Sequence, residues 1–193
     1  IGVVGPVRTG KSTFIKRFMD LLVLPHIEDE FERERANDEL PQSAGGKTIT
    51  TTEPKFIPKE AASISLGEGA QARVRLIDCV GYMVEGAAGH MENGEERLVK
   101  TPWSEEEIPF TQAAETGTRK VIADHSSVGI VVTCDGSFTE IGRQQYEPAE
   151  ERTVRELKKL NKPFIVLLNT TKPYSEETGK LAEVLSEKYQ VSV

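Results

Sequence analysis

The chain has 193 residues, of which 37% are hydrophobic and 28% are charged, and its formal net charge is −7 at pH 7. Such a chain can bury one good core, so we expect one soluble domain. No apolar run approaches the length of a membrane span, and the acidic balance argues against nucleic acid as a main partner. Cys79 and Cys134 stand in apolar stretches and are expected to be reduced and buried.

The strongest motif lies at the start of the chain. Residues 5–12 read GPVRTGKS and fit G-x-x-x-x-G-K-[ST], between an apolar strand end and an amphipathic helix that Pro25 stops. In such a loop, glycines let successive N–H groups point at an oligophosphate, and the helix directs its positive end at the same anion. Roughly 1% of chains this long match by chance. The expected nucleotide contacts are Gly5, Val7, Arg8, Thr9, Gly10, Lys11, Ser12 and Thr13.

A charged segment and a threonine-rich stretch come next. Residues 28–42 have a weak helical pattern and predict a solvated helix or loop. Residues 43–46 (SAGG) form a flexible joint before Thr48, Thr50, Thr51 and Thr52. These threonines fit an edge strand. After a phosphate loop they also fit a mobile segment, 28–53, that brings a threonine to Mg²⁺ and the γ-phosphate.

An antiparallel hairpin is predicted from Ser63–Leu66 and Arg73–Asp78, because both alternate polar and apolar residues around Gly67–Gly69. Its second strand ends in D-C-V-G. Beside a phosphate loop, Asp78 stands where a water-mediated Mg²⁺ ligand is expected. Gly81 can offer its N–H to a γ-phosphate because no side chain blocks the approach.

The rest of the chain alternates between helix and strand, after an irregular insertion at 82–109. Buried strands are expected at 128–134 and 164–168, with a shortened final strand at 191–193. Helices are expected over 110–125, from Pro148 to Leu160, and over 175–189. This order predicts an α/β, doubly wound, mostly parallel P-loop sheet with one antiparallel edge hairpin, and a ligand at the strand carboxyl ends.

The order of these motifs resembles the translation-factor and Ras-like class of GTPases. That class reads guanine with N-K-x-D, whose aspartate accepts two N–H bonds from the base. Here the matching residues run from Asn169 to Lys172, and lysine has only donors. Tyr82 follows D-x-x-G where Ras-like members carry a water-orienting glutamine. We therefore expect a lost preference for guanine and slow hydrolysis.

Further segments, together with these departures, resemble the stage IV sporulation protein A family over the whole chain. They read VRTGKSTFIK, DELPQS, TTEPKF, DCVGY, TPW and ETGTRKVI. The resemblance implies hydrolysis of Mg-ATP that drives self-assembly into static polymers on the forespore surface, in the mother-cell cytoplasm. Members of this family continue into further domains, and the chain opens without an initiator Met. Residues 1–193 are thus expected to be the N-terminal ATPase domain.

The resemblance also implies roles and partners. The expected partners are a small amphipathic membrane-anchoring peptide and further coat proteins, and the forespore membrane is reached only through them. Lys11 and Asp78 would be catalytic, together with the γ-phosphate-sensing Thr51 and Thr52, with which Thr48 and Thr50 compete. The Mg²⁺ residues would be Ser12, Thr51, Thr52 and Asp78, and Gly81, Asn169 and Lys172 would complete the nucleotide site.

Two other functions fit the same motifs. A GTP- or ATP-dependent switch that binds effector proteins is the first alternative, although Lys172 and Tyr82 count against it. A small-molecule phosphotransferase is the second. It needs an arginine-rich lid, whereas the 82–109 segment is acidic and carries only Arg97.

Overall fold

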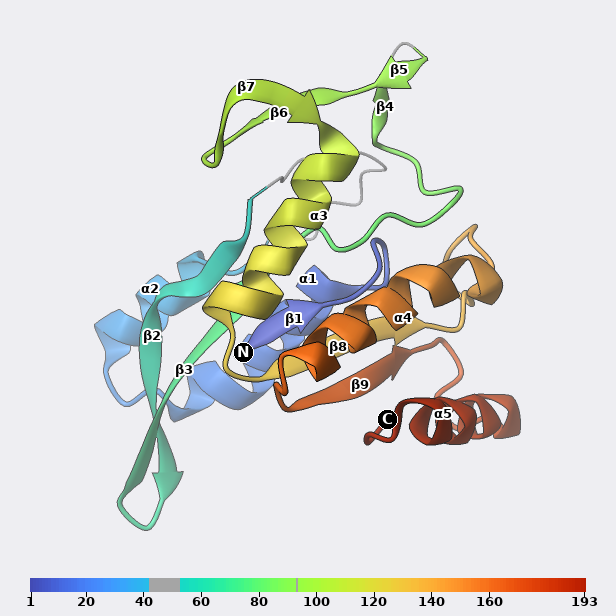
Figure 1. The fold of residues 1–193 in the computed structure, drawn as a ribbon. Helices are drawn as coiled ribbons and strands as arrows, with labels where there is room; N and C mark the ends of the chain where they lie inside the picture. Colours follow the sequence, from blue (N-terminus) through green and yellow to red (C-terminus); the bar gives the residue numbers. More distant parts are fainter. Residues whose placement is uncertain (42–52, 93) are drawn as a thin grey trace.

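The structure is a computed structural model that describes residues 1–41, 53–92 and 94–193. Its central sheet has five strands in the order β2-β3-β1-β8-β9 (Figure 1). The strands are β1 (Gly2–Val4), β2 (Lys55–Gly67), β3 (Ala70–Asp78), β8 (Gly129–Cys134) and β9 (Phe164–Asn169). β1 pairs in parallel with β3 and β8, β8 pairs in parallel with β9, and only β2 runs antiparallel. The predicted sheet with one antiparallel edge hairpin is confirmed.

Helices cover both faces of this sheet. They are α1 (Lys11–Phe18), α2 (Glu30–Asp38), α3 (Phe110–Lys120), α4 (Arg143–Lys159) and α5 (Glu176–Tyr189). Short turns extend two of them: η1 (Met19–Val23) and η2 (Leu24–His26) after α1, and η3 (Val121–His125) after α3. In Figure 1, α3 and α4 lie in front of the strands and α1 lies behind them.

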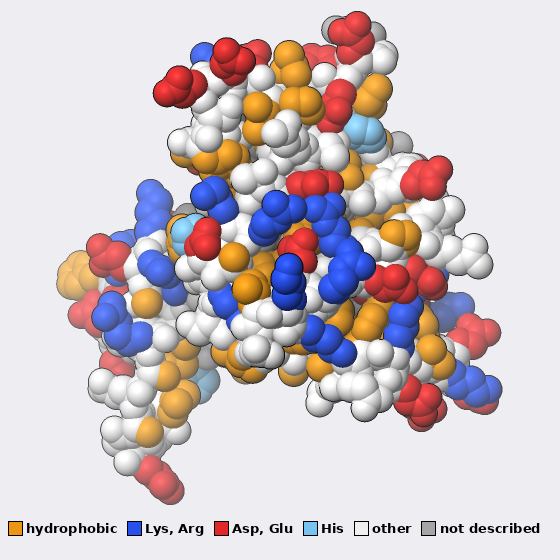
Figure 2. Space-filling view, in the orientation of Figure 1, with side chains coloured by type: hydrophobic (Ala, Val, Ile, Leu, Met, Phe, Trp, Pro, Cys, Tyr) orange, Lys and Arg blue, Asp and Glu red, His pale blue; other side chains and the backbone are white. Residues whose placement is uncertain are grey.

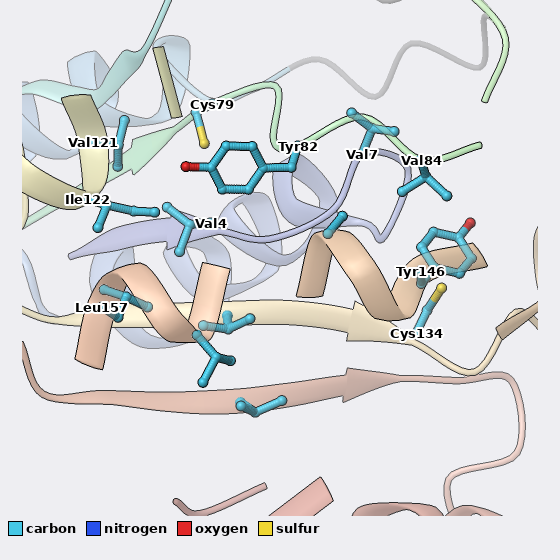
Figure 3. Close-up of a cluster of buried hydrophobic side chains, with 14 of the residues drawn as sticks. Val4, Val7, Cys79, Tyr82, Val84, Val121, Ile122, Cys134, Tyr146 and Leu157 are labelled. Carbon is cyan, nitrogen blue, oxygen red and sulfur yellow. The ribbon is translucent and has the colours of Figure 1, made fainter. Parts of the chain in front are cut away.

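Two apolar clusters hold the layers together, one on each face of the sheet. Ile15 and Met19 pack behind it with Leu76 and Val132, and all four have at most 1% of their surface exposed. On the other face, Val4 and Val131 belong to a cluster with side chains of η3, α4 and α5. Figure 3 shows Val4 of this cluster near Ile122 and Leu157. Cys79 and Cys134 are buried free thiols in this second cluster, as expected.

A buried polar cluster fastens α5 to α4 within this front layer. The Glu150 carboxylate is fully buried and accepts hydrogen bonds from Arg143 at 2.7 Å, from Thr133 at 2.5 Å and from the Tyr189 hydroxyl at 2.5 Å. A buried carboxylate is stable only when it is paired in this way. The buried Glu150 carboxylate of α4 therefore helps to position the final helix, α5.

Several expectations about single elements are wrong. α4 begins at Arg143, not at Pro148, which lies inside the helix. The extra turn is favoured because it buries Tyr146 and brings Arg143 to Glu150, and these contacts outweigh the backbone hydrogen bond that proline lacks. β9 is an edge strand with only Val166 fully buried. On the helices predicted before Pro25 and over 175–189, Leu22 and Val184 are 54% and 57% exposed.

Two further corrections concern the insertion at 82–109 and the last three residues. Residues 82–109 are not irregular throughout: β4 (Met91–Glu92) pairs with β5 (Glu95–Glu96), and β6 (Leu98–Thr101) pairs with β7 (Ser104–Pro109). These hairpins stand beyond the N-terminal end of α3 (Figure 1). The last three residues do not form a strand, although the Ser192 carbonyl accepts a hydrogen bond from Val166 N–H at 3.0 Å.

Candidate nucleotide site

The phosphate loop joins β1 to α1 at the carboxyl edge of the sheet, next to the ends of β3 and β8. Gly5 has φ +130°, and a Cβ there would lie 2.4 Å from the Val132 carbonyl oxygen, so only glycine fits. Gly10 has φ +92° and precedes the first turn of α1. Arg8 adopts φ 60°, a conformation uncommon for a residue with a side chain. The motif therefore curls as the sequence predicts.

Lys11 lies inside this loop. Its side chain has only 5% exposed surface, and Nζ donates a 2.5 Å hydrogen bond to the Pro6 carbonyl, which also accepts from the Thr9 hydroxyl at 3.0 Å. Burial lowers the pKa of Lys11, and the nearby Cys79 and Asp78 oppose that shift. An ammonium group held with so little water is well suited to bind an anion, because an anionic partner would offset its desolvation.

Ser12 and Asp78 meet at the mouth of the loop, 66 residues apart in sequence. Ser12 Oγ donates a 2.6 Å hydrogen bond to Asp78 Oδ2. Asp78 Oδ1 is buried and has no hydrogen-bond partner among the described residues. Burial raises the pKa of Asp78, and the bond from Ser12 opposes the increase.

This pair fits a Mg²⁺ ion. A hydroxyl and a carboxylate with one free buried oxygen are hard donors, and Mg²⁺ in nucleotide sites is held by one or two such groups together with phosphates and water. Among residues 1–41, 53–92 and 94–193, no group of three or more His, Cys, Asp or Glu side chains gathers to hold a metal. A metal at Ser12 and Asp78 would therefore depend on the nucleotide for further ligands.

The D-x-x-G segment packs directly against the phosphate loop. Tyr82 N–H donates to the Gly5 carbonyl at 3.2 Å, and the Tyr82 carbonyl accepts from Val7 N–H at 2.9 Å. Gly81 has φ +97°, and a Cβ there would lie 2.7 Å from Lys11 Nζ. The Gly81 N–H, expected to be available to a γ-phosphate, instead donates to the Thr118 hydroxyl at 3.1 Å.

Tyr82 does not stand where it could orient an attacking water. Its side chain is buried, its hydroxyl donates to Glu156, and the Arg152 guanidinium lies 4.1 Å from its ring centre. Figure 3 shows the ring beside Cys79 and Val4, turned away from Val7 of the phosphate loop. Burial, followed by the bond to Glu156, raises the Tyr82 pKa. The side chain is a packing element.

The turn after β9 also reaches the phosphate loop. The Asn169 side-chain amide donates to the Thr9 carbonyl at 3.0 Å. Thr170 donates to Asp135 at 2.5 Å, which ties this turn to the loop after β8. Lys172 is exposed two residues later, and its backbone is fixed by bonds to Thr170 and Ser175.

The structure thus brings most of the predicted residues to one edge of the sheet. Val7 is buried, with its N–H committed to Tyr82, whereas Ser12 and Thr13 are exposed on the first turn of α1. Arg8 is partly buried, and its guanidinium donates to the Ala88 carbonyl at 3.1 Å. The predicted threonine sensors, Thr48, Thr50, Thr51 and Thr52, lie outside the described residues.

Two features of the site were not predicted from the sequence. Thr118, in the last turn of α3, is fully buried and reaches the Gly81 amide. A cavity of about 400 Å³ opens beside Gly10 and Arg8, between residues 86–88 and 138–141. Thr118 belongs to the segment ETGTRKVI, but that segment predicts neither its contact with Gly81 nor the cavity, because both depend on how distant segments pack.

The surface beside the site is unevenly charged. Lys and Arg side chains gather over α3 and α4 in Figure 2, although the whole chain is acidic. Exposed members on these helices include Arg119, Arg155 and Lys159. Arg152, in the same region, is ion-paired with Glu115 at 2.8 Å. Within the described ranges, no helix is long and apolar enough to cross a membrane.

Comparison with known proteins identifies the kind of domain. A family model described as "Stage IV sporulation protein A, ATPase domain" matches residues 1–193. Proteins named stage IV sporulation protein A are similar over all of this chain: 57% identical in Bacillus anthracis, 58% in Clostridioides difficile (strain 630) and 55% in Bacillus subtilis (strain 168). The chain spans 39% of the length of each of these relatives.

Proposed function

Since the chain belongs to the stage IV sporulation protein A family and corresponds to its ATPase domain, we propose that it hydrolyses Mg-ATP to drive assembly of a protein layer. In the full-length protein this layer would be a polymer at the base of the spore coat, formed on the forespore surface in the mother-cell cytoplasm. The observation that carries the proposal is the meeting of Lys11, Ser12 and Asp78 at one sheet edge.

Each of these residues has a defined task in that reaction. Lys11 would leave the Pro6 carbonyl and bind the β- and γ-phosphates, where its buried charge stabilises the negative charge that develops during transfer. Ser12 and Asp78 would hold the metal, the hydroxyl directly and the carboxylate through water. A bound Mg²⁺ neutralises phosphate charge and orients the γ-phosphate.

Thr51 and Thr52 are proposed to close on the γ-phosphate. Because Tyr82 is packed against Glu156, the residue that orients the attacking water has to come from elsewhere, and slow turnover is expected. Preference for ATP over GTP is proposed because Lys172 stands where an acid would accept the guanine N–H groups.

The proposed partners are further copies of the full-length protein, a small amphipathic peptide that anchors the layer to the forespore membrane, and other coat proteins. Nucleic acid is not proposed as a partner. The segments around the γ-phosphate would order when ATP binds and relax after hydrolysis. ATP turnover would thereby change the shape of the protein surface.

Light scattering of the full-length protein tests the proposal. Large, salt-resistant polymers are expected with ATP and Mg²⁺, and not with a non-hydrolysable triphosphate. The isolated 1–193 fragment should bind and slowly hydrolyse ATP while staying small. Equal polymerisation of the full-length protein with both nucleotides would show that binding suffices, and the hydrolysis-driven part of the proposal would fail.

A further inference from the structure

The amide of Gly81 lies between the Thr118 hydroxyl and the phosphate loop. On one side is the Thr118 hydroxyl, which accepts its hydrogen at 3.1 Å. On the other is the phosphate loop, since a Cβ on Gly81 would lie 2.2 Å from the Gly5 carbonyl oxygen and 2.7 Å from Lys11 Nζ. A γ-phosphate held by Lys11 would therefore stand close to this amide, which already has an acceptor.

Thr118 is held rigidly in place. It is fully buried in α3, between the buried Gly117 and the short turn η3. Burial raises the pKa of the neighbouring Cys79 thiol to about 11, and the Thr118 hydroxyl opposes that rise. Because its side chain cannot turn to water, its acceptor stays aimed at Gly81.

The chain next to Gly81 is equally fixed. Tyr82 is bonded to Gly5 and Val7 through its backbone and to Glu156 through its hydroxyl. Arg152 stacks on the Tyr82 ring and holds Glu115 of α3 through two bonds of 2.8 and 2.9 Å. These contacts leave rotation of the peptide plane before Gly81 as the simplest way to redirect its N–H, and glycine permits such a rotation.

We propose, on the basis of the nucleotide placement described above, that Thr118 is a positioning residue for the ATPase reaction, which holds the Gly81 N–H until the γ-phosphate of ATP takes it. Binding of the triphosphate then breaks one buried neutral hydrogen bond and makes a stronger one to an anion. Diphosphate has no γ-phosphate and leaves the Thr118 bond intact. Thr118 therefore sets how strongly the site distinguishes the two nucleotides.

Thr118→Val tests this, because valine keeps the shape of threonine and removes the acceptor. Thr118→Ser is the matched control that keeps the hydroxyl. In the full-length protein with Mg²⁺, the affinities for a non-hydrolysable ATP analogue and for ADP are measured by fluorescence displacement. Thr118→Val should increase the affinity for the ATP analogue about tenfold relative to the affinity for ADP. Thr118→Ser should match the wild type, and Thr118→Ala replaces Thr118→Val if the latter does not fold.

An unchanged ratio of triphosphate to diphosphate affinity in Thr118→Val, or an equal shift in Thr118→Ser, would overturn this role. A failure of the proposed nucleotide site is distinguishable from this result, because the wild-type protein itself would then bind neither nucleotide.

Discussion

The Asn169 side-chain amide donates a 3.0 Å hydrogen bond to the carbonyl of Thr9, although the two residues are 160 positions apart. This bond fixes the turn after β9 against the phosphate loop. It also explains the tight fit at Gly10, where a Cβ would lie 2.5 Å from the Asn169 nitrogen. The residues that follow Asn169 are thereby held beside any nucleotide that the loop binds.

The first prediction concerns Lys172, which follows on this turn. ATP should displace a fluorescent ATP probe better than GTP, because an ammonium group cannot accept hydrogen bonds from guanine. Lys172→Asp supplies the missing acceptor and should shift the ratio of affinities toward GTP by about tenfold. Lys180→Asp, an exposed change on α5, is the control. If GTP bound the wild-type protein tenfold more tightly than ATP in this displacement assay, the prediction would be wrong.

The second prediction concerns Lys11. Lys11→Ala should weaken binding of the triphosphate about tenfold or more, because a charge-assisted contact to phosphate oxygens is lost in a buried site. Lys16→Ala, on the same helix, should have little effect. Isothermal titration with a non-hydrolysable analogue measures both. Wild-type affinity in Lys11→Ala would mean that the loop does not hold the phosphates.

The third prediction separates binding from turnover. Thr51→Ala combined with Thr52→Ala should leave ATP affinity largely unchanged and suppress phosphate release, because these hydroxyls are expected to act only on the closed γ-phosphate. The same variant should not polymerise in the full-length protein. A steady-state rate equal to that of the wild type would place the sensor elsewhere, at Thr48 or Thr50.

The fourth prediction uses the raised pKa of Asp78. Burial raises this pKa above its ordinary value of 3.8, so the ionised carboxylate destabilises the folded state at neutral pH. That penalty is absent below pH 3.8, where the group is protonated in both states, and grows as the pH rises through the folded pKa. Asp78→Asn should therefore raise the free energy of unfolding at pH 7.

Urea denaturation at pH 7 and near pH 4 measures this difference, which should shrink at the lower pH. Asp38→Asn, an exposed change at the end of α2, should show no such pattern. The Asp78→Asn protein should also need more Mg²⁺ for ATP turnover. A loss of stability at pH 7 would contradict the assignment of Asp78 as a group kept for function.

The fifth prediction concerns Tyr82. Tyr82→Phe removes the hydrogen bond to Glu156 and should lower the free energy of unfolding by about 1–2 kcal/mol. Its hydroxyl does not reach the phosphate loop, so the rate of ATP hydrolysis should remain close to that of the wild type. Urea denaturation and a phosphate-release assay on the same preparation check both parts. A rate reduced a hundredfold with unchanged stability would make Tyr82 a catalytic group.

Three local patterns determine structure without help from distant residues. They are the motif G-x-x-x-x-G-K-S, the alternation of polar and apolar residues in the hairpin, and the apolar run of β8. Gly5 and Gly10 have to curl the loop, and a strand such as 129–134 has to be buried, because its side chains are apolar on both faces. The fold class, the place of Lys11, Ser12 and Asp78, and the departure at Lys172 were therefore predictable from the sequence.

Tertiary packing determines which hydrogen bonds and packing contacts the residues of the site make. The Gly81 amide donates to Thr118 and Tyr82 is buried against Glu156, because α3 and α4 pack against the D-x-x-G segment. Pro148 lies inside α4 because Arg143 finds Glu150, and the burial of Tyr146 outweighs the local preference of proline. Each outcome depends on partners 7 to 74 positions away, and no local pattern specifies which of them will meet.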